Sequence, residues 1–330
     1  MDLSTTYLGF KLSHPLMTGA CPLADSMDNI RRLEDAGVAA IVMRSLFEEQ
    51  IVSEQLATNR SMDVPADSYA EALSYFPTPE EFKLGPDEYL EQIRKIKQAV
   101  SVPVFASLNG ASLGGWLDYA KLMQEAGADA LELNVYDLGT EAKETGEVLV
   151  QRTVDMVGAV KKAVNIPVAV KLSPYYSSFA NVAKRLDGVK ADGLILFNRF
   201  YQADIDIEGL EVLSALTLSH PGALLLRLRW LAILAGRVQA SLAVTGGVHG
   251  ALEVIKAVMC GAQAVQMVSA LLQNGPEHLK KVREEVSRWL EEHEYDSLQQ
   301  ALGSMSLLKC PNPKAFERAN YAHILQSWQA

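Results

Sequence analysis

Six apolar segments of the sequence each end in a side chain that can carry charge or form hydrogen bonds. A lysine at such a segment end can act as a fixed cation or, when desolvated, as a Schiff-base nucleophile. If the segments are parallel strands of one barrel, their carboxyl ends ring one mouth and can all contact a single ligand. Any one of these residues, taken alone, could simply be a polar side chain that forms hydrogen bonds within the protein at the end of a strand. The six positions are Arg44-Ser45, Asn109, Asn134, Lys171, Asn198 and Thr245.

A glycine turn near the end of the chain indicates a phosphate site. The apolar run 242–244 stops at Thr245-Gly246-Gly247, a helical pattern follows, and a second apolar run over 264–268 leads into Ser269. Glycines allow a ligand to approach the backbone and expose N–H groups, and Val268-Ser269 adds more beside the next helix N-terminus. After strands 7 and 8 of a barrel, this arrangement forms a phosphate cup. The plainer alternative is a tight βαβ turn.

The alternation of strands and helices predicts an α/β fold, a (β/α)8 TIM barrel over residues 1–293. Residues 5–14 read as a hairpin that turns near Gly9. A doubly wound sheet is the second choice, but no GxGxxG follows the first strand. The predicted strands span 15–17, 38–43, 104–107, 130–133, 168–170, 194–197, 242–244 and 264–268. The predicted helices include 27–36, 86–100, 148–164, 177–186, 223–236 and 251–259.

Three segments interrupt the regular pattern. Residues 46–85, after the second strand, are rich in acidic, small, aromatic and proline residues, and a connection this long suggests a lid-like insertion. Residues 199–221 are expected to form a second long loop. Residues 294–330 are expected to form a helical C-terminal extension packed on the barrel, anchored by Phe316, Tyr321, Ile324 and Leu325, or engaged in a subunit contact.

Composition excludes several functional classes. The 330 residues are 49% hydrophobic and carry a net charge of −10, so a sizeable core is expected and nucleic-acid binding is not. Arg227, Arg229 and Arg237 read as a solvated or phosphate-facing helix side. The three cysteines lack CxxC spacing and the histidines lack HxxxH spacing, so neither an iron–sulfur cluster nor another metal site is expected. No signal peptide or membrane-spanning run is recognised, which predicts a cytoplasmic protein.

Seven stretches together resemble the dihydroorotate dehydrogenase family of flavin-mononucleotide (FMN) barrels, over roughly residues 5–292. They are HPLMTGA, VMRSL, LELNV, VAVKLSPYY, LFNR, VTGGV and CGAQAVQMVSALL. The resemblance implies that FMN is the cofactor and that Lys171 stands at its N1/C2=O edge, where a cation stabilises the reduced flavin. It places the phosphate on Gly246, Gly247, Val268 and Ser269, with Gly222. The remaining implied FMN contacts are Gly19, Ala20, Arg44, Ser45, Asn134 and Thr245.

The substrate side departs from the family pattern. Asn134 and Asn198 match two amides that hold a pyrimidine, with Arg44 and Arg199 as further candidate substrate contacts. Arg44 replaces the lysine usual at its position, and the NSMG substrate loop is absent. The family's NLSCPN motif, which carries the catalytic cysteine or serine base, reads Asn134-Val135-Tyr136-Asp137-Leu138-Gly139 here. Asp137, or Tyr136 beside it, could replace the base if desolvated; the alternative is a solvated loop carboxylate.

These observations favour an FMN-dependent oxidoreductase of the CH–CH type, acting on dihydroorotate in pyrimidine biosynthesis or on a related small ring or enoyl substrate. Lys171, Asp137 and Tyr136 are the candidate catalytic residues. Two alternatives stay open: a non-redox lyase or aldolase using Lys171 on a phosphorylated substrate, and a non-catalytic flavoprotein. Without an iron–sulfur motif or a nicotinamide fold, the electron acceptor is expected to be a separate molecule. The resemblance also suggests a homodimer.

Overall fold

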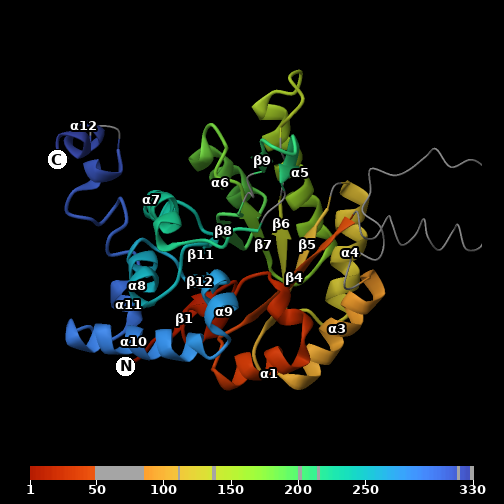
Figure 1. Cartoon of the computed structure of the whole chain (residues 1–330), viewed down its shortest axis with the longest axis horizontal. Helices are drawn as coiled ribbons and strands as arrows, with labels where there is room; N and C mark the ends of the chain where they lie inside the picture. Colours follow the sequence, from red (N-terminus) through yellow and green to blue (C-terminus); the bar gives the residue numbers. More distant parts are fainter. Residues whose placement is uncertain are drawn as a thin grey trace, which may run out of the picture.

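A computed structural model of the chain describes residues 1–48, 85–110, 112–135, 139–199, 203–213, 216–317 and 320–327. Its centre is an eight-stranded parallel sheet that forms a TIM barrel, as predicted (Figure 1). Around the barrel the strand order is β3-β12-β11-β8-β7-β6-β5-β4. The strands are β3 (Leu16–Thr18), β4 (Ile41–Phe47), β5 (Val104–Asn109), β6 (Ala130–Asn134), β7 (Val168–Leu172), β8 (Gly193–Leu196), β11 (Ser241–Thr245) and β12 (Ala264–Met267).

Hydrogen bonds between β3 and the start of β4 close the barrel. Ala39 N donates to Leu16 O over 3.0 Å, and Thr18 N donates to Ala40 O over 3.3 Å. The hydroxyl of Thr18 also accepts a 2.9 Å bond from Val42 N. The first and last strands of the series are therefore neighbours, and all eight carboxyl ends lie around one mouth.

Helices surround the sheet and bury its outer face (Figure 1). Helix α1 shows the local logic: the side chain of Ser26 caps its N-terminus by accepting from Asn29 N, and Ile30 and Leu33 pack inward. The helices are α1 (Met27–Asp35), α3 (Pro86–Ala99), α4 (Leu113–Glu125), α5 (Gly146–Ala163), α6 (Phe179–Gly188), α7 (Leu224–Leu234), α8 (Ala251–Met259), α9 (Ser269–Asn274) and α10 (His278–Glu292), with short 3₁₀ turns η1 (Pro22–Asp25) and η3 (Pro221–Ala223).

The predicted N-terminal hairpin closes the other end of the barrel. β1 (Thr5–Tyr7) pairs antiparallel with β2 (Phe10–Leu12). The ring of Tyr7 lies 6.3 Å from that of Phe105, and a Cβ at Gly193 would lie 2.5 Å from the Leu8 side chain. Small residues at the strand starts leave room for these rings: Ala130, Ala169, Ala243 and Ala264. The described residues therefore pack the floor of the barrel, and the polar strand ends lie at the opposite mouth.

Two predicted boundaries are wrong. Arg44-Ser45 does not end the second strand, because β4 continues to Phe47 through a bulge between Val42 and Ser45. The segment 199–221 is not entirely a loop: β9 (Asp204–Asp206) pairs with β10 (Glu211–Leu213) as a hairpin. Both strands are three residues long and largely exposed, so no buried apolar run marks them.

The C-terminal residues divide into two parts. Residues 298–310, including α11 (Leu298–Ala301), contact the barrel: Met305 N donates to Met259 O and Leu307 N donates to Ala232 O, both over 2.8 Å. Beyond them, η4 (Pro313–Phe316) lies against α7, and α12 (Asn320–Gln326) lies apart from the ring of helices (Figure 1). Tyr321, Ile324 and Leu325, expected as anchors, are exposed.

The predicted insertion at 46–85 lies outside the described residues except at its two ends. Among the helices that the structure describes, none combines the length and the apolar character needed to cross a membrane.

Candidate active site

A layer of polar side chains lies inside the barrel, above the packed floor. Successive residues of a strand point to opposite faces, so residues two apart along each strand face the barrel axis together. Ala130, Glu132 and Asn134 follow this rule on β6, as Ala169 and Lys171 do on β7. The buried polar residues of the inner strand faces and strand ends are Ser45, Ser107, Asn109, Glu132, Asn134, Lys171, Thr245 and Gln266. Five of the six strand-end positions predicted from the sequence therefore converge here.

The charge of Lys171 is balanced by a carboxylate in the same layer. Its Nζ lies 2.5 Å from Glu132 Oε1, and the other carboxylate oxygen accepts a 2.5 Å bond from Gln266 Nε2. Lys171 and Glu132 are only 5% and 2% exposed. In so dry an environment the electrostatic attraction between the ammonium and the carboxylate is strong. Lys171 is therefore a fixed cation, held in place from below.

An amide network crosses the mouth next to Lys171. Asn198 Nδ2 donates to Asn134 Oδ1 over 2.7 Å, and Asn134 Nδ2 donates to Ser45 Oγ over 3.2 Å. Ser45 shares a 2.7 Å hydrogen bond with Ser107, although either hydroxyl can be the donor. These four side chains fix one another's orientation, so the amides present a preorganised edge to a ligand.

Arg44 is held on the outer side of the same mouth. Its guanidinium makes a two-pronged ion pair with Asp25 of η1, with Nε 3.2 Å from Oδ1. The bulge in β4 turns Ser45 toward Ser107 and leaves Arg44 facing η1. The charge that was expected to face FMN or an anionic substrate is thus largely compensated within the protein.

The glycine turn has the geometry of an anion cup. Gly246 and Gly247 have φ of +86° and +82°, which other residues rarely adopt. A Cβ at Gly247 would lie 2.5 Å from Leu224 N, so this turn has no room for a side chain. Gly247 N donates to Ser219 Oγ over 3.2 Å, and that hydroxyl donates to Ser269 Oγ over 2.8 Å. N–H and hydroxyl groups therefore gather where the phosphate was predicted.

The other predicted cofactor residues lie at neighbouring strand ends. Gly19 follows β3 and packs so closely that a Cβ there would lie 2.7 Å from the Val268 side chain; Ala20 comes next. Thr245 ends β11, and Gly222 is part of η3 beside the cup. Arg199 follows Asn198 just beyond β8.

Asp137 and Tyr136, the candidate bases, lie outside the described residues. Cys21 is the one cysteine near the mouth, and burial raises its pKa to about 11. It is therefore a protonated thiol at neutral pH and does not replace the missing base.

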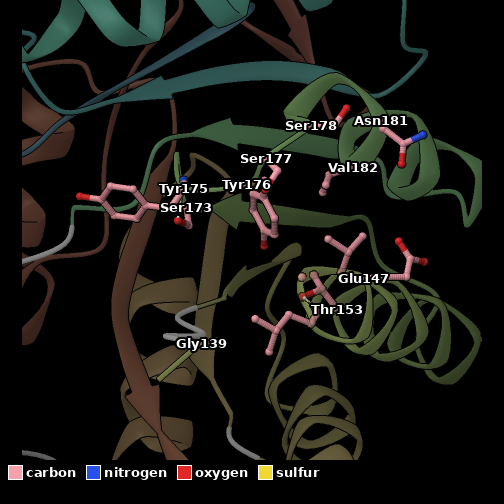
Figure 2. Close-up of a pocket in the computed structure, with 13 residues that line it drawn as sticks. Gly139, Glu147, Thr153, Ser173, Tyr175, Tyr176, Ser177, Ser178, Asn181 and Val182 are labelled. Atoms are coloured by element: carbon pink, nitrogen blue, oxygen red, sulfur yellow. Dashed lines mark hydrogen bonds between the residues drawn. The ribbon is translucent and has the colours of Figure 1, made fainter. Parts of the chain in front are cut away.

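A separate cavity of about 630 Å³ opens beside the mouth, between the start of α5 and the loop into α6 (Figure 2). Its lining includes Thr153, Ser173, Tyr176 and Asn181, with Gly139 at its edge. Tyr175, which also borders it, points away from the helices in Figure 2. Lys171, Asn134 and the glycine turn do not line it, so it adjoins the site but does not contain it.

Sequence reasoning missed several residues of the mouth: Asp25, Glu132, Ser219 and Gln266. Glu132 had a signal, because it lies two residues before Asn134 and must share its inward face. Gln266 is likewise a polar residue inside an apolar strand. No sequence pattern marked Asp25 or Ser219. Both residues lie in segments between strands and helices, and the path of such segments depends on tertiary structure.

Comparison with known proteins shows the family to which the chain belongs. Residues 81–290, well over half of the 330, match the family model described as dihydroorotate dehydrogenase. The chain belongs to the dihydroorotate dehydrogenase family. A catalytic subunit of dihydroorotate dehydrogenase B (NAD(+)) from Thermoplasma acidophilum is 27% identical over 315 residues, covering 92% of this chain and 98% of the relative.

Two further relatives carry the same name. The catalytic subunit from Methanocaldococcus jannaschii is 26% identical over 301 residues, with 88% of this chain and 94% of the relative covered. The one from a Geobacter species is 25% identical over 319 residues, with 93% and 99% covered. The similarity therefore extends over nearly the whole of these chains, and it confirms the family that the motifs indicated.

Proposed function

We propose that this protein is an FMN-dependent oxidoreductase of the CH–CH type that acts on dihydroorotate or on a related small ring or enoyl substrate. The observation that carries the proposal is the pairing, in one mouth, of a glycine anion cup with a buried, fixed lysine cation. The cup suits the phosphate of a mononucleotide, and the cation suits a ring system that gains negative charge on reduction.

The residues present fit FMN. The left-handed backbone of Gly246 and Gly247, with Ser219 and Ser269, would hold the phosphate. The close packing of Gly19 on Val268 leaves a smooth backbone surface on which a ring can lie. When bound, FMN supplies a hydride acceptor at N5.

Lys171 would stabilise negative charge at the flavin's N1/C2=O edge. Its pairing with Glu132 also weighs against the lyase alternative, because a Schiff base requires the neutral amine as nucleophile. In the structure the Lys171 nitrogen is instead held in a 2.5 Å ion pair with a buried carboxylate, so it is not free to attack a carbonyl.

On the substrate side, we propose that Asn134 and Asn198 bind the polar edge of a small ring. Oxidation of a CH–CH bond removes a hydride and a proton, and the proton needs a base at the mouth. Asp137, three residues past Asn134, is the proposed base, with Tyr136 as the alternative. Dihydroorotate is the first substrate to test, since relatives carry its name.

The relatives are named as catalytic subunits, so we also propose that this chain passes electrons to a separate acceptor, a partner protein or a small molecule. Co-purification of the chain with a second protein, or its isolation as a homodimer, would be visible in one size-exclusion experiment.

The proposed cofactor is tested with the purified full chain. Its absorption spectrum, and the flavin released on denaturation, should identify FMN. If the protein is colourless, fluorescence titration with FMN should show saturable quenching. Borohydride inactivation in the presence of a carbonyl substrate, in a protein that binds no flavin, would instead support the lyase.

A further inference from the structure

Arg227, expected on a solvated or phosphate-facing helix side, is a buried cation beside the glycine turn. Arg227 on α7 is 8% exposed, and its guanidinium donates to three backbone carbonyls: Thr245 O, Ala223 O at 2.5 Å and Phe197 O at 3.3 Å. All three acceptors are neutral. Within the described part of the chain, no carboxylate forms an ion pair with it.

A second positive charge approaches the same place. The pKa of Arg227 is lowered to about 10, mainly by burial and also by the charge of Arg199. It therefore stays protonated at neutral pH, so the protein holds a buried cation that another cation repels. Burying a charge without a counterion is costly, and proteins usually supply an opposite charge at such a position.

The guanidinium lies directly against the turn. A Cβ at Gly246 would lie 2.8 Å from Arg227 Nη2, and the next residue, Gly247, directs its N–H to Ser219 at 3.2 Å. Helix α7, which carries Arg227, starts against the same turn, because Leu224 N is the atom that a Gly247 Cβ would meet. The guanidinium and the N–H and hydroxyl groups of the cup therefore contact the same glycine turn.

We propose that Arg227 is the charge partner of the FMN phosphate and makes this site select flavin mononucleotide over unphosphorylated riboflavin. It acts through the turn: it orders the Thr245–Gly247 backbone by its bond to Thr245 O and places a positive charge beneath the phosphate. The inference rests on the proposed FMN site and extends it to the choice between two flavins.

The test is a pair of binding titrations, FMN and riboflavin, on flavin-free full-length protein by fluorescence quenching. The ratio of the two affinities isolates the phosphate contribution. For Arg227→Gln we expect this ratio to fall by about tenfold or more, with riboflavin affinity little changed. Arg229→Gln, on the exposed side of the same helix, is the matched control and should leave the ratio unchanged.

Arg227→Lys separates charge from structural support. This variant keeps the positive charge but cannot bond all three carbonyls. We expect its ratio of FMN to riboflavin affinity to be close to that of the wild type. The same measurement can be made if Arg227→Gln does not fold. A ratio as low in Arg227→Lys as in Arg227→Gln, or an unchanged ratio in Arg227→Gln, would overturn the inference. Wild-type protein that binds neither flavin would instead overturn the proposed function itself.

Discussion

On the β11–β12 side of the mouth, the glycine turn, Ser219, Ser269 and the buried Arg227 form a dense set of N–H, hydroxyl and guanidinium groups. On the β4–β6 side, Arg44 is neutralised by Asp25, and the family's catalytic loop has lost its cysteine or serine. The first side follows the family pattern and the second departs from it. Under the proposed function, this contrast means that the cofactor side keeps the family's residues while the side for substrate recognition and proton transfer differs.

The largest effect is expected from a side chain in the glycine turn. Gly247→Ala places a Cβ 2.5 Å from Leu224 N at φ +82°, so the turn must open. We expect FMN affinity to fall by about 100-fold or more, from roughly 3 kcal/mol of combined strain and lost contacts. Gly127→Ala has the same kind of strain at φ +101° with no close neighbour, and titration should show FMN affinity unchanged in that control.

Removing Lys171 tests whether this cation, which lies between the two sides of the mouth, is needed for flavin reduction by substrate. Lys171→Met leaves Glu132 buried without its counterion, which should cost about 3–5 kcal/mol in the free energy of unfolding. Glu132→Gln in the same chain should recover much of that loss, while flavin reduction by substrate stays slowed by about 100-fold or more. Urea denaturation and stopped-flow reduction measure the two effects. A double variant that reduces flavin at the wild-type rate would exclude Lys171 from the chemistry.

The substrate side is addressed by Asn134→Ala. This change removes the hydrogen bonds to Ser45 and Asn198, so the polar groups that bind the substrate ring would no longer be held in a fixed orientation. We expect the KM for substrate to rise by about tenfold, from one or two lost hydrogen bonds, with FMN affinity within about threefold of wild type. A fall in FMN affinity as large as the rise in KM would mean that the two sides of the mouth do not act separately.

The smallest effect on the site, and a control for stability, comes from His14 at the far end of the barrel. Burial lowers its pKa to about 4, and the neutral ring accepts from Leu16 N and bonds Gly37 O at 2.6 Å. Because the unfolded chain binds this proton near pH 6.5, stability should decline as the pH falls from about 6.5 to 4, by up to about 3 kcal/mol.

His14→Gln should flatten that pH dependence without changing FMN affinity at neutral pH. Thermal melts of both proteins across this pH range test it. A wild-type stability that does not vary over the range would contradict the assignment of a buried neutral histidine.

Most of the barrel could be predicted from the sequence because its strands are apolar runs with polar ends and its helices carry periodic apolar faces. The glycine turn was predictable for a similar reason, since Gly246 and Gly247 follow a strand directly. The pairing of Arg44 with Asp25 was not, because it depends on a bulge that no local pattern marks. Arg227 was expected on a solvated or phosphate-facing helix side; the solvated alternative is wrong, because the packing of α7 on β11 buries this residue.

The central claim, that this mouth binds FMN and reduces it with a small ring substrate, is tested most directly by anaerobic titration of the purified protein with dihydroorotate. We expect a yellow, FMN-containing protein whose flavin absorbance is bleached by dihydroorotate or, if its substrate side has diverged, by a related dihydro-ring compound. A colourless protein that takes up no FMN would contradict the claim.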